Sequence, residues 1–284
     1  MSTAAPAAPA VPLPRPIVAR SRPRRSTRRS WALNRYHLIT ALLPLAILAL
    51  WAIATYYAWV PPILLPSPLS LWPAFQELLL LGGLWGDFWE SLRIVVQGFT
   101  FGAIIGISLG AICGYSKLFE RFFGPTFDAI RQIPPIAVLS LLVLWFGIGD
   151  AAKVILIAKA VFFPVFLNTL QGIRGVQKEY VEVGHVLQLT RWQFARKIII
   201  PGALPSILTG IRFGAGLSWS LVVFAETLSG HKGLGYLIWR AQELLFINQL
   251  FIAVLFITAL GLTQDRLIRL LERRLLRWKQ GYSG

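Results

Sequence analysis

The chain has 284 residues, of which 56% are apolar and 14% are charged, and its formal net charge at pH 7 is +16. Because a soluble domain carries about 25% charged residues, this composition excludes an ordinary soluble protein and indicates a membrane protein. The single cysteine, Cys113, excludes an intramolecular disulfide and a cysteine-based metal site.

The first 37 residues are rich in alanine and proline and carry basic charge only. Seven arginines lie between positions 20 and 35, and the first acidic residue of the chain is Glu77. This composition predicts a disordered cytosolic tail, residues 1–37, whose positive charge orients the first membrane span. An organellar transit peptide and a twin-arginine signal are the alternative interpretations of the arginine-rich part.

Long apolar runs then predict six membrane-spanning helices in residues 38–284, because a helix of ~20 apolar residues crosses a bilayer. The predicted spans cover residues 38–59, 91–114, 122–146, 151–170, 206–228 and 246–267. The segment 60–90 has five prolines and neither Lys nor Arg. It predicts an external loop that contains a short amphipathic helix.

Glycines and prolines mark two of these spans. In the second span, glycine recurs at every fourth position, at Gly98, Gly102, Gly106 and Gly110. This spacing places the glycines on one face, where another backbone can approach closely, and so predicts helix packing rather than a nucleotide-binding loop. In the third span, Pro134 and Pro135 predict a kink or break. The bend is either a hinge or an end of the transport path, or simply a bent packed helix.

One basic residue, Lys159, falls inside the fourth predicted span, about 12 Å below the outer surface at 1.5 Å per residue. A lysine near the bilayer centre costs about 2.5–3.5 kcal/mol, so it is expected to face a cavity or a partner. It either attracts an anionic substrate, pairs with Glu226 near the outer end of the fifth span, or snorkels to the surface. Trp145, Phe163 and Trp219 either line a transport path or serve as packing.

The polar stretch 176–205 separates the fourth and fifth spans. Its six charged residues, which exclude it from hydrocarbon, are Lys178, Glu179, Glu182, Arg191, Arg196 and Lys197. Apolar residues at spacings of three and four predict a short amphipathic helix within it. Such a helix between two spans is typical of a docking element, because it fits a groove on a partner protein.

The positions of the basic residues indicate the orientation of the predicted spans in the membrane. With an inside N-terminus, 23 of the 28 Lys and Arg residues fall in or next to cytosolic segments. This is the positive-inside pattern, and it explains the net charge without a nucleic-acid partner. It also places both termini and the stretch 176–205 in the cytosol.

No catalytic or metal-binding motif is present. The chain lacks the Gly-x-x-x-x-Gly-Lys-Ser/Thr phosphate loop. Its three histidines, His37, His185 and His231, match no zinc spacing. The sequence therefore predicts a non-catalytic membrane protein that takes its energy from another subunit.

The stretch 176–205 resembles the EAA loop of type I ABC importer permeases, the binding-protein-dependent inner-membrane components. Their pattern is Glu-Ala-Ala, three residues, Gly, nine residues and Ile-x-Leu-Pro. In this chain 182–184 stands for Glu-Ala-Ala and 198–201 for Ile-x-Leu-Pro. Gln188 replaces the glycine, which ordinarily permits a tight turn or a close approach.

Further segments are similar to the sulfonate, taurine and nitrate branch of this family. They are LPSP at 65–68, LWFGIGD at 144–150, FFPVFLNT at 162–169, PGALPSILTGIRFGAGLSW at 201–219 and AET at 225–227. The resemblance implies an importer permease for a small anion, with an aliphatic sulfonate or taurine as the first choice. Nitrate, bicarbonate and pyrimidine-precursor importers share the same frame.

The resemblance also implies the architecture and the partners. It implies an all-α membrane protein of six transmembrane helices, with a short cytosolic coupling helix between spans four and five. Two identical permease copies would lie side by side in the bacterial inner membrane, with an external or periplasmic solute-binding protein. Two separate ATPase subunits would hold ATP and Mg. The residues placed in the ATPase groove and at the end of the motif would be Glu182, Val183, Gly184, Leu187, Gln188, Leu189 and Pro201.

A different class of protein, a secondary carrier driven by an ion gradient, is the remaining alternative. Such a carrier is expected to contain inverted repeats, often with broken helices around a site at the middle of the membrane. The sequence shows no such duplication. A carrier also has no need for a cytosolic loop with the EAA pattern.

Overall fold

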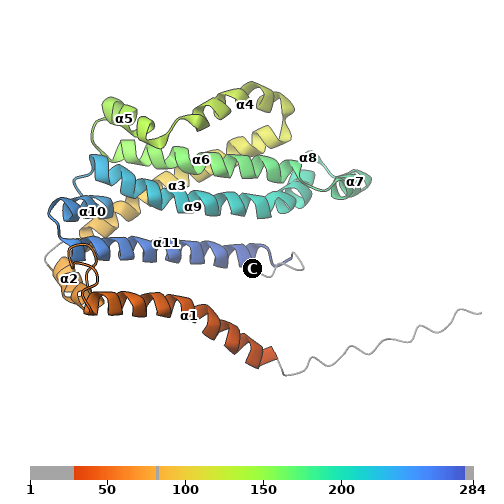
Figure 1. Ribbon diagram of the computed structural model, residues 1–284. Helices are drawn as coiled ribbons and strands as arrows, with labels where there is room; N and C mark the ends of the chain where they lie inside the picture. The colour runs from red at the N-terminus through yellow and green to blue at the C-terminus, as the bar shows by residue number, and fades with distance from the viewer. Residues whose placement is uncertain (1–28, 81–82, 279–284) are drawn as a thin grey trace, which may run out of the picture. The chain divides into compact units, whose positions relative to one another are not determined.

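The computed structural model describes residues 29–80 and 83–278, and every regular element in these residues is a helix (Figure 1). The chain divides into two compact units, one that ends at Trp51 and one that begins at Ala52. The helices are α1 (Arg29–Tyr56), α2 (Pro68–Leu80), α3 (Leu84–Tyr115), α4 (Lys117–Gln132), α5 (Pro135–Phe146), α6 (Asp150–Arg174), α7 (Lys178–Val186), α8 (Arg191–Phe194), the π-helix η1 (Ala195–Ile199), α9 (Ile200–Ser229), α10 (Leu234–Glu243) and α11 (Ile247–Leu275). The all-helical prediction is confirmed.

The first unit contributes the greater part of α1. This helix begins at Arg29, nine residues before the predicted start of the first span. Residues 1–28 of the predicted tail lie outside the described residues. The remaining elements belong to the second unit.

The described residues contain three helices that are long and apolar enough to cross a membrane. They are Leu84–Tyr115, Arg191–Leu228 and Ile247–Leu275. The pair formed by α4 and α5 adds a fourth when it is counted as one broken span, bent by 95°. This bend confirms the break predicted at Pro134 and Pro135, because neither proline can donate the hydrogen bond that would continue α4.

The second unit is built around α6, which packs against both α3 and α9 (Figure 1). The glycines of α3 face α6. A Cβ atom added to Gly102 would lie 2.5 Å from the carbonyl oxygen of Ala158, and one on Gly110 would lie 2.7 Å from that of Phe166. On α9, a Cβ on Gly210 would lie 2.8 Å from the carbonyl oxygen of Pro164. The predicted glycine packing surface is confirmed, since only glycine permits this approach.

Replacing Gly102 with alanine is expected to destabilise the protein, because the new methyl group would meet backbone and force α3 and α6 apart. Overpacking of this kind costs about 1–3 kcal/mol. Gly261 of α11 has nothing within 4 Å of its added Cβ, so Gly261→Ala should instead stabilise the helix by about 1 kcal/mol. Thermal unfolding in mild detergent measures both changes. Equal midpoints for the two variants would show that the α3–α6 packing is looser than described.

The helix that contains the fifth predicted span is longer than expected. The span was predicted to begin at residue 206, yet α8, η1 and α9 form one helical stretch from Arg191 to Ser229. A widened π turn precedes Pro201, and the N–H of Ile200 donates to the carbonyl of Ala195, five residues back. Because the turn is widened there, the helix continues through Pro201, and Pro205 then lies inside α9.

Candidate functional site

The short helix predicted in the stretch 176–205 is α7, and it packs on the helical stretch that follows it. Gly184 is the buried residue of α7. A Cβ on Gly184 would lie 2.6 Å from Cδ1 of Ile198 and 2.7 Å from the ring of Phe194. The ring of His185 stacks on Phe194, with 5.8 Å between the ring centroids. The glycine thus lets α7 lie directly on η1 and α8.

The opposite face of α7 is exposed. Glu182 and Val186 are each two residues from Gly184, so at 100° per residue each lies about 160° around the helix from it. Both side chains are exposed, and Val186 keeps 82% of its surface accessible. The exposed apolar residues of α7, of the turn after it and of the start of α8 form what we call the α7 patch, which consists of Tyr180, Val183, Val186, Leu187 and Trp192. Exposed apolar side chains gathered beside charges are typical of a surface that binds another protein.

The turn after α7 is made without the expected glycine. Gln188 adopts a φ of 50°, in the left-handed region. Its N–H donates to the carbonyl of His185, and the N–H of Leu189 donates to that of Gly184. Thr190 and Gln193 then form a reciprocal capping box that starts α8. The tight turn is therefore kept, and a non-glycine residue occupies a position that favours glycine.

Gln188→Gly is expected to relieve about 1 kcal/mol of backbone strain in this turn. Gln188→Val should increase the strain, because a β-branched residue adopts the left-handed conformation with difficulty. Hydrogen–deuterium exchange of the amides at 187–190 measures the difference. Exchange should slow in the glycine variant and accelerate in the valine variant, and the reverse order would contradict the described turn.

The predicted site residues of the docking stretch have different surroundings. Glu182, Val183, Leu187 and Gln188 are exposed, Leu189 and Pro201 are half-buried, and Gly184 is buried. Pro201 lies near the start of α9 rather than in the turn that follows α7. Six of these residues, those between positions 182 and 189, therefore lie in α7 and the turn that follows it. Pro201 lies apart from them, beyond the end of η1.

Lys159 of α6 contacts the break between α4 and α5. Its Nζ donates to the carbonyl oxygen of Ile133 at 2.8 Å. Ile133 is the C-cap residue that directly follows α4, and the last carbonyls of a helix have no donor within that helix. The ion pair between Lys159 and Glu226, one of the two main expectations, is wrong, because each of these side chains has other partners.

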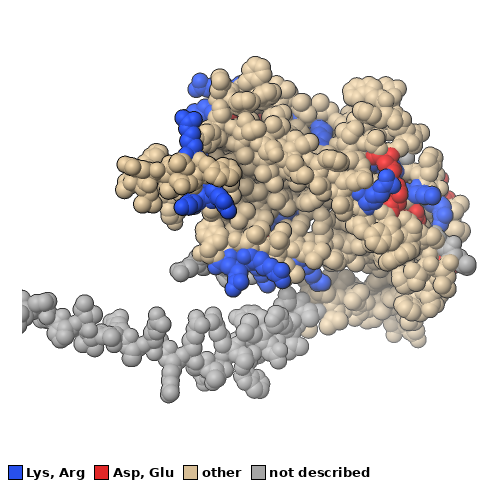
Figure 2. All heavy atoms as spheres, turned by 180° about the vertical axis from the view of Figure 1, so that it is seen from behind, with Lys and Arg blue, Asp and Glu red and all other residues tan. Residues whose placement is uncertain are grey.

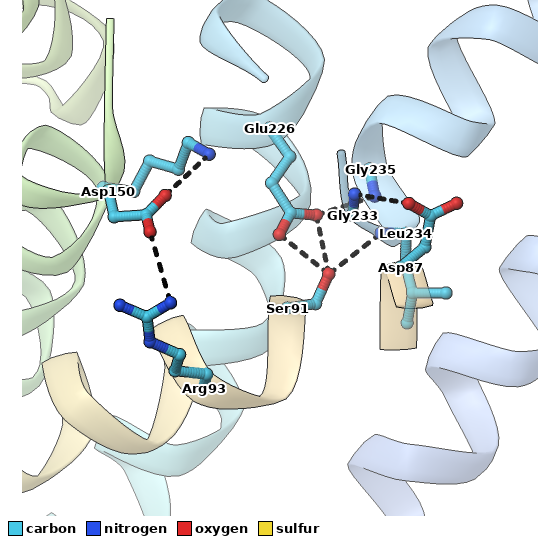
Figure 3. Close-up of polar contacts among 9 residues, drawn as sticks. Asp87, Ser91, Arg93, Asp150, Glu226, Gly233, Leu234 and Gly235 are labelled. Carbon is cyan, nitrogen blue, oxygen red and sulfur yellow. Dashed lines mark hydrogen bonds and ion pairs between the residues drawn. The ribbon is translucent and has the colours of Figure 1, made fainter. Parts of the chain in front are cut away.

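Glu226 of α9 lies in a buried network at one end of the second unit, shown in Figure 3. The Oγ atom of Ser91 lies 2.7 and 2.8 Å from the two carboxylate oxygens. The N–H of Gly235 donates to Oε2 at 2.8 Å, and the N–H of Leu234 donates to Ser91 Oγ at 2.9 Å. Beside them, the N–H of Gly233 donates to Oδ1 of Asp87 at 2.9 Å. Carboxylates at the start of α10 are favourable, because the first N–H groups of a helix lack partners within it.

The glycines of the stretch 229–235 explain how the backbone reaches the carboxylate. Gly233 has a φ of 111°, and a Cβ there would lie 2.4 Å from the carboxylate carbon of Glu226. A Cβ on Gly235 would lie 2.4 Å from the carbonyl oxygen of Val223. This glycine-rich turn therefore binds a carboxylate of the same chain, that of Glu226. The sequence interpretation missed Ser91 and Asp87.

A neighbouring ion cluster ties α3 to α6. Asp150 lies 3.8 Å from the guanidinium of Arg93, as Figure 3 shows, and 3.5 Å from Nζ of Lys153. Lys153 is buried, with 4% of its surface accessible. These contacts and the Glu226 network hold one end of α3, α6, α9 and α10 together.

The other residues predicted for a transport path do not meet at one place. Trp145 is exposed on α5, whereas Phe163 of α6 and Trp219 of α9 are buried. Lys159 and Phe163 line one apolar groove between α3, α4 and α6. Trp219 packs in the main apolar core instead.

A second ion cluster joins α9 to α11, and the sequence interpretation used its members only for their charge. Arg212 Nε donates to Asp265 Oδ1 at 2.8 Å. Arg269 Nε donates to the other carboxylate oxygen at 2.7 Å. Two guanidinium groups thus share one carboxylate. The signal available in the sequence was the acidic residue among the arginines of the last helix.

Charge is distributed unevenly over the second unit. Figure 2 shows Lys and Arg without neighbouring Asp or Glu towards the left of the view, the side to which α7 turns, whereas the visible Asp and Glu lie towards the right, beside other Lys and Arg. Apolar and neutral residues fill most of the surface between them. This distribution agrees with the charge asymmetry found in the sequence.

Comparison with known proteins gives consistent matches. The family model described as the binding-protein-dependent transport system inner membrane component matches residues 102–277. The putative aliphatic sulfonates transport permease protein SsuC of Bacillus subtilis (strain 168) is 38% identical, and the match covers 86% of this chain and 88% of that protein. The bicarbonate transport system permease protein CmpB of Synechococcus elongatus is 36% identical over 75% of this chain and 81% of its own length. The taurine transport system permease protein TauC of Escherichia coli (strain K12) is 31% identical over 87% and 92%.

Solved structures show the same fold at low identity. A crystal structure of an amino acid ABC transporter with histidines has a TM-score of 0.55 and 19% identity, and the match covers 70% of this chain and 97% of that one. At this identity the likeness concerns the fold alone.

Proposed function

The chain belongs to the family of binding-protein-dependent transport system inner membrane components, and we propose that it is the permease subunit of an ATP-driven importer of a small anion. The proposed substrate is an aliphatic sulfonate or taurine. The observation that carries this choice is the similarity, at 38% and 31% identity, to relatives named for aliphatic sulfonates and taurine. Bicarbonate is the second candidate, because a relative named for it is 36% identical.

The proposed arrangement in the membrane has six spans and cytosolic termini, with residues 38–284 as the permease domain. The three long apolar helices and the bent α4–α5 pair supply four spans. The other two are α6 and the apolar part of α1, Leu42–Tyr56, which each coincide with an apolar run of the sequence. Positive charge at the α7 side supports a cytosolic position for that side.

The α7 helix is the proposed coupling helix, and its exposed face would fit a groove of the ATPase. Glu182 and the α7 patch would supply the contacts, and Gly184 would hold α7 against η1 and α8. From Arg191 to Leu228 the chain forms a helical stretch of 38 residues, about 57 Å long at 1.5 Å per residue. Movement of α7 would therefore be transmitted along α9 to the other end of the unit.

Under this proposal the chain itself performs no covalent chemistry. The relatives are named as transport permease proteins. ATP and Mg would be held by two partner ATPase subunits, and a second copy of this chain would complete the path. A solute-binding protein outside the membrane would deliver the anion.

Uptake by reconstituted transporter tests the substrate. Proteoliposomes that contain the permease and its ATPase are supplied with binding protein loaded with taurine, ethanesulfonate, nitrate or bicarbonate. ATP-dependent uptake of taurine or ethanesulfonate is expected. Uptake of bicarbonate or nitrate alone would show that the proposed substrate is wrong and that the importer carries that anion instead. Uptake without ATP, driven by an ion gradient, would overturn the importer assignment in favour of a secondary carrier.

A further inference from the structure

A groove of about 610 Å³ runs along the exposed side of α9 beside α11. Its polar lining comes from Thr209, Arg212 and Ser220 of α9 and from Asp265 and Glu272 of α11. Phe213 and Leu217 of α9 complete that wall, with Gly216 between the two polar ends. The groove thus combines one arginine and two carboxylates with small and apolar residues.

The exposed side of α9 carries small and polar residues beside the two large apolar residues Phe213 and Leu217. Thr209, Gly216 and Ser220 are exposed and lie on one face, at separations of seven and four residues. The packed side carries buried apolar residues, which include Leu208, Ala215, Trp219 and Val222. A helix face that meets only lipid is apolar throughout, so the small and polar residues beside the exposed Phe213 and Leu217 favour a partly hydrated surface within the membrane.

Arg212 is held in this groove by one of its three nitrogens. Its Nε donates to Asp265, and in the described part of the chain the two terminal nitrogens of the guanidinium have no hydrogen-bond partner. The side chain keeps 40% of its surface exposed. Because Asp265 is shared with Arg269, this carboxylate does not neutralise both guanidinium groups. Glu272 lies two helical turns further along α11, at the far end of the lining.

A guanidinium with two free N–H edges is suited to a small oxyanion. It presents its donors in a rigid fork that matches carboxylate, phosphate or sulfonate oxygens, and it is more weakly hydrated than an ammonium group. Thr209 lies one turn away on the same face, and because its hydroxyl donates to the carbonyl of Pro205 at 3.0 Å, it contributes a small side chain rather than a free donor. The absence of a side chain at Gly216 leaves room beside the arginine.

We infer that Arg212, beside the open space at Gly216, forms a transient binding site for a small oxyanion such as a sulfonate on the transport path. Asp265 is the counterion of Arg212, and the anion would bind the terminal nitrogens of the guanidinium that Asp265 leaves free. The inference deepens the proposed function and rests on it for the class of substrate. It assigns the recognition of the anion inside the membrane to this arginine rather than to Lys159, whose Nζ is engaged by Ile133.

Two variants that break the same ion pair distinguish this role from a purely structural tie. Arg212→Met removes the guanidinium and leaves the carboxylate, whereas Asp265→Asn removes the competing carboxylate and leaves the guanidinium. The site predicts opposite results. Arg212→Met should lower ATP-dependent uptake of taurine or ethanesulfonate at least ten-fold, whereas Asp265→Asn should bind the anion several-fold more tightly.

The measurements are uptake in proteoliposomes and equilibrium binding of radiolabelled ethanesulfonate to the purified permease–ATPase complex. Arg269→Met is the matched control, because Arg269 shares the same carboxylate and does not line the groove. Arg212→Lys keeps the positive charge without the fork, so its uptake should fall between those of Arg212→Met and the unchanged protein. Co-purification of the ATPase shows that each variant assembles.

Equal losses in Arg212→Met and Asp265→Asn would overturn the inference and leave a structural tie. Full uptake by Arg212→Met would overturn it as well. If the unchanged protein imports bicarbonate or nitrate and no sulfonate, the substrate assignment fails, and the same four variants are then compared with that anion. The two failures are therefore distinguishable.

Discussion

Glu182→Lys is expected to uncouple ATP hydrolysis from transport without unfolding the helical core. Glu182 lies on the exposed face of α7, on the far side of the helix from Gly184, which holds α7 in place. Since its side chain does not take part in the packing of α7 on η1 and α8, the change acts on the surface offered to a partner. Reversal of a charge at the centre of an interface costs several kcal/mol of binding, and uptake should fall at least ten-fold.

The readouts for Glu182→Lys are co-purification of the ATPase and ATP-dependent uptake. Glu243→Lys is the control, because Glu243 is an exposed carboxylate on α10, outside the α7 patch. This control should leave co-purification of the ATPase unchanged. Normal uptake by Glu182→Lys would show that the α7 face is not the ATPase contact.

Glu226→Ala is expected to cause the largest loss of stability among single substitutions in the described chain. Glu226 is completely buried, and its carboxylate accepts hydrogen bonds from Ser91 and Gly235. Without it, two buried donors lose their acceptor, at about 1–3 kcal/mol for each donor, and a cavity remains. Glu226→Gln keeps the volume and one acceptor oxygen, so it should lose much less.

Thermal unfolding in mild detergent ranks the Glu226 variants. The expected order of midpoints is the unchanged protein, then Glu226→Gln, then Glu226→Ala. Gly233→Ala gives an independent test, since its methyl group would collide with the carboxylate and its φ is positive. It should also lower the midpoint. A midpoint of Glu226→Ala equal to that of the exposed-site variant Glu243→Ala would refute the buried network.

The elements that the sequence predicted well are those whose signal is local. Glycine at every fourth position of α3 indicates a packing face, whichever helix packs against it. In the structure that helix is α6. Pro134 and Pro135 break a helix for covalent reasons, and the pair α4–α5 bends there. The charged stretch after Gly175 predicted a short amphipathic helix, which is α7.

The features that the sequence did not predict depend on residues far apart in the chain. Glu226 meets Ser91 across 135 positions, and Gly233 meets Asp87 across 146. The partner of Lys159 depends on where α4 ends, which the position of the prolines gives only in part. Pro205 was expected to begin a span, but it lies inside α9, which continues the π turn at η1.

The central claim is that the exposed face of α7 binds an ATPase, and site-specific photo-crosslinking in native membranes tests it most directly. A photoreactive residue is placed at Val183 or Leu187 of the α7 patch, and at Val254, an exposed position of α11, as control. A covalent adduct with an ATP-binding subunit is expected from positions 183 and 187 and not from 254. The assignment of this protein as an importer permease would be contradicted if no adduct contained an ATP-binding subunit and the protein also purified without one.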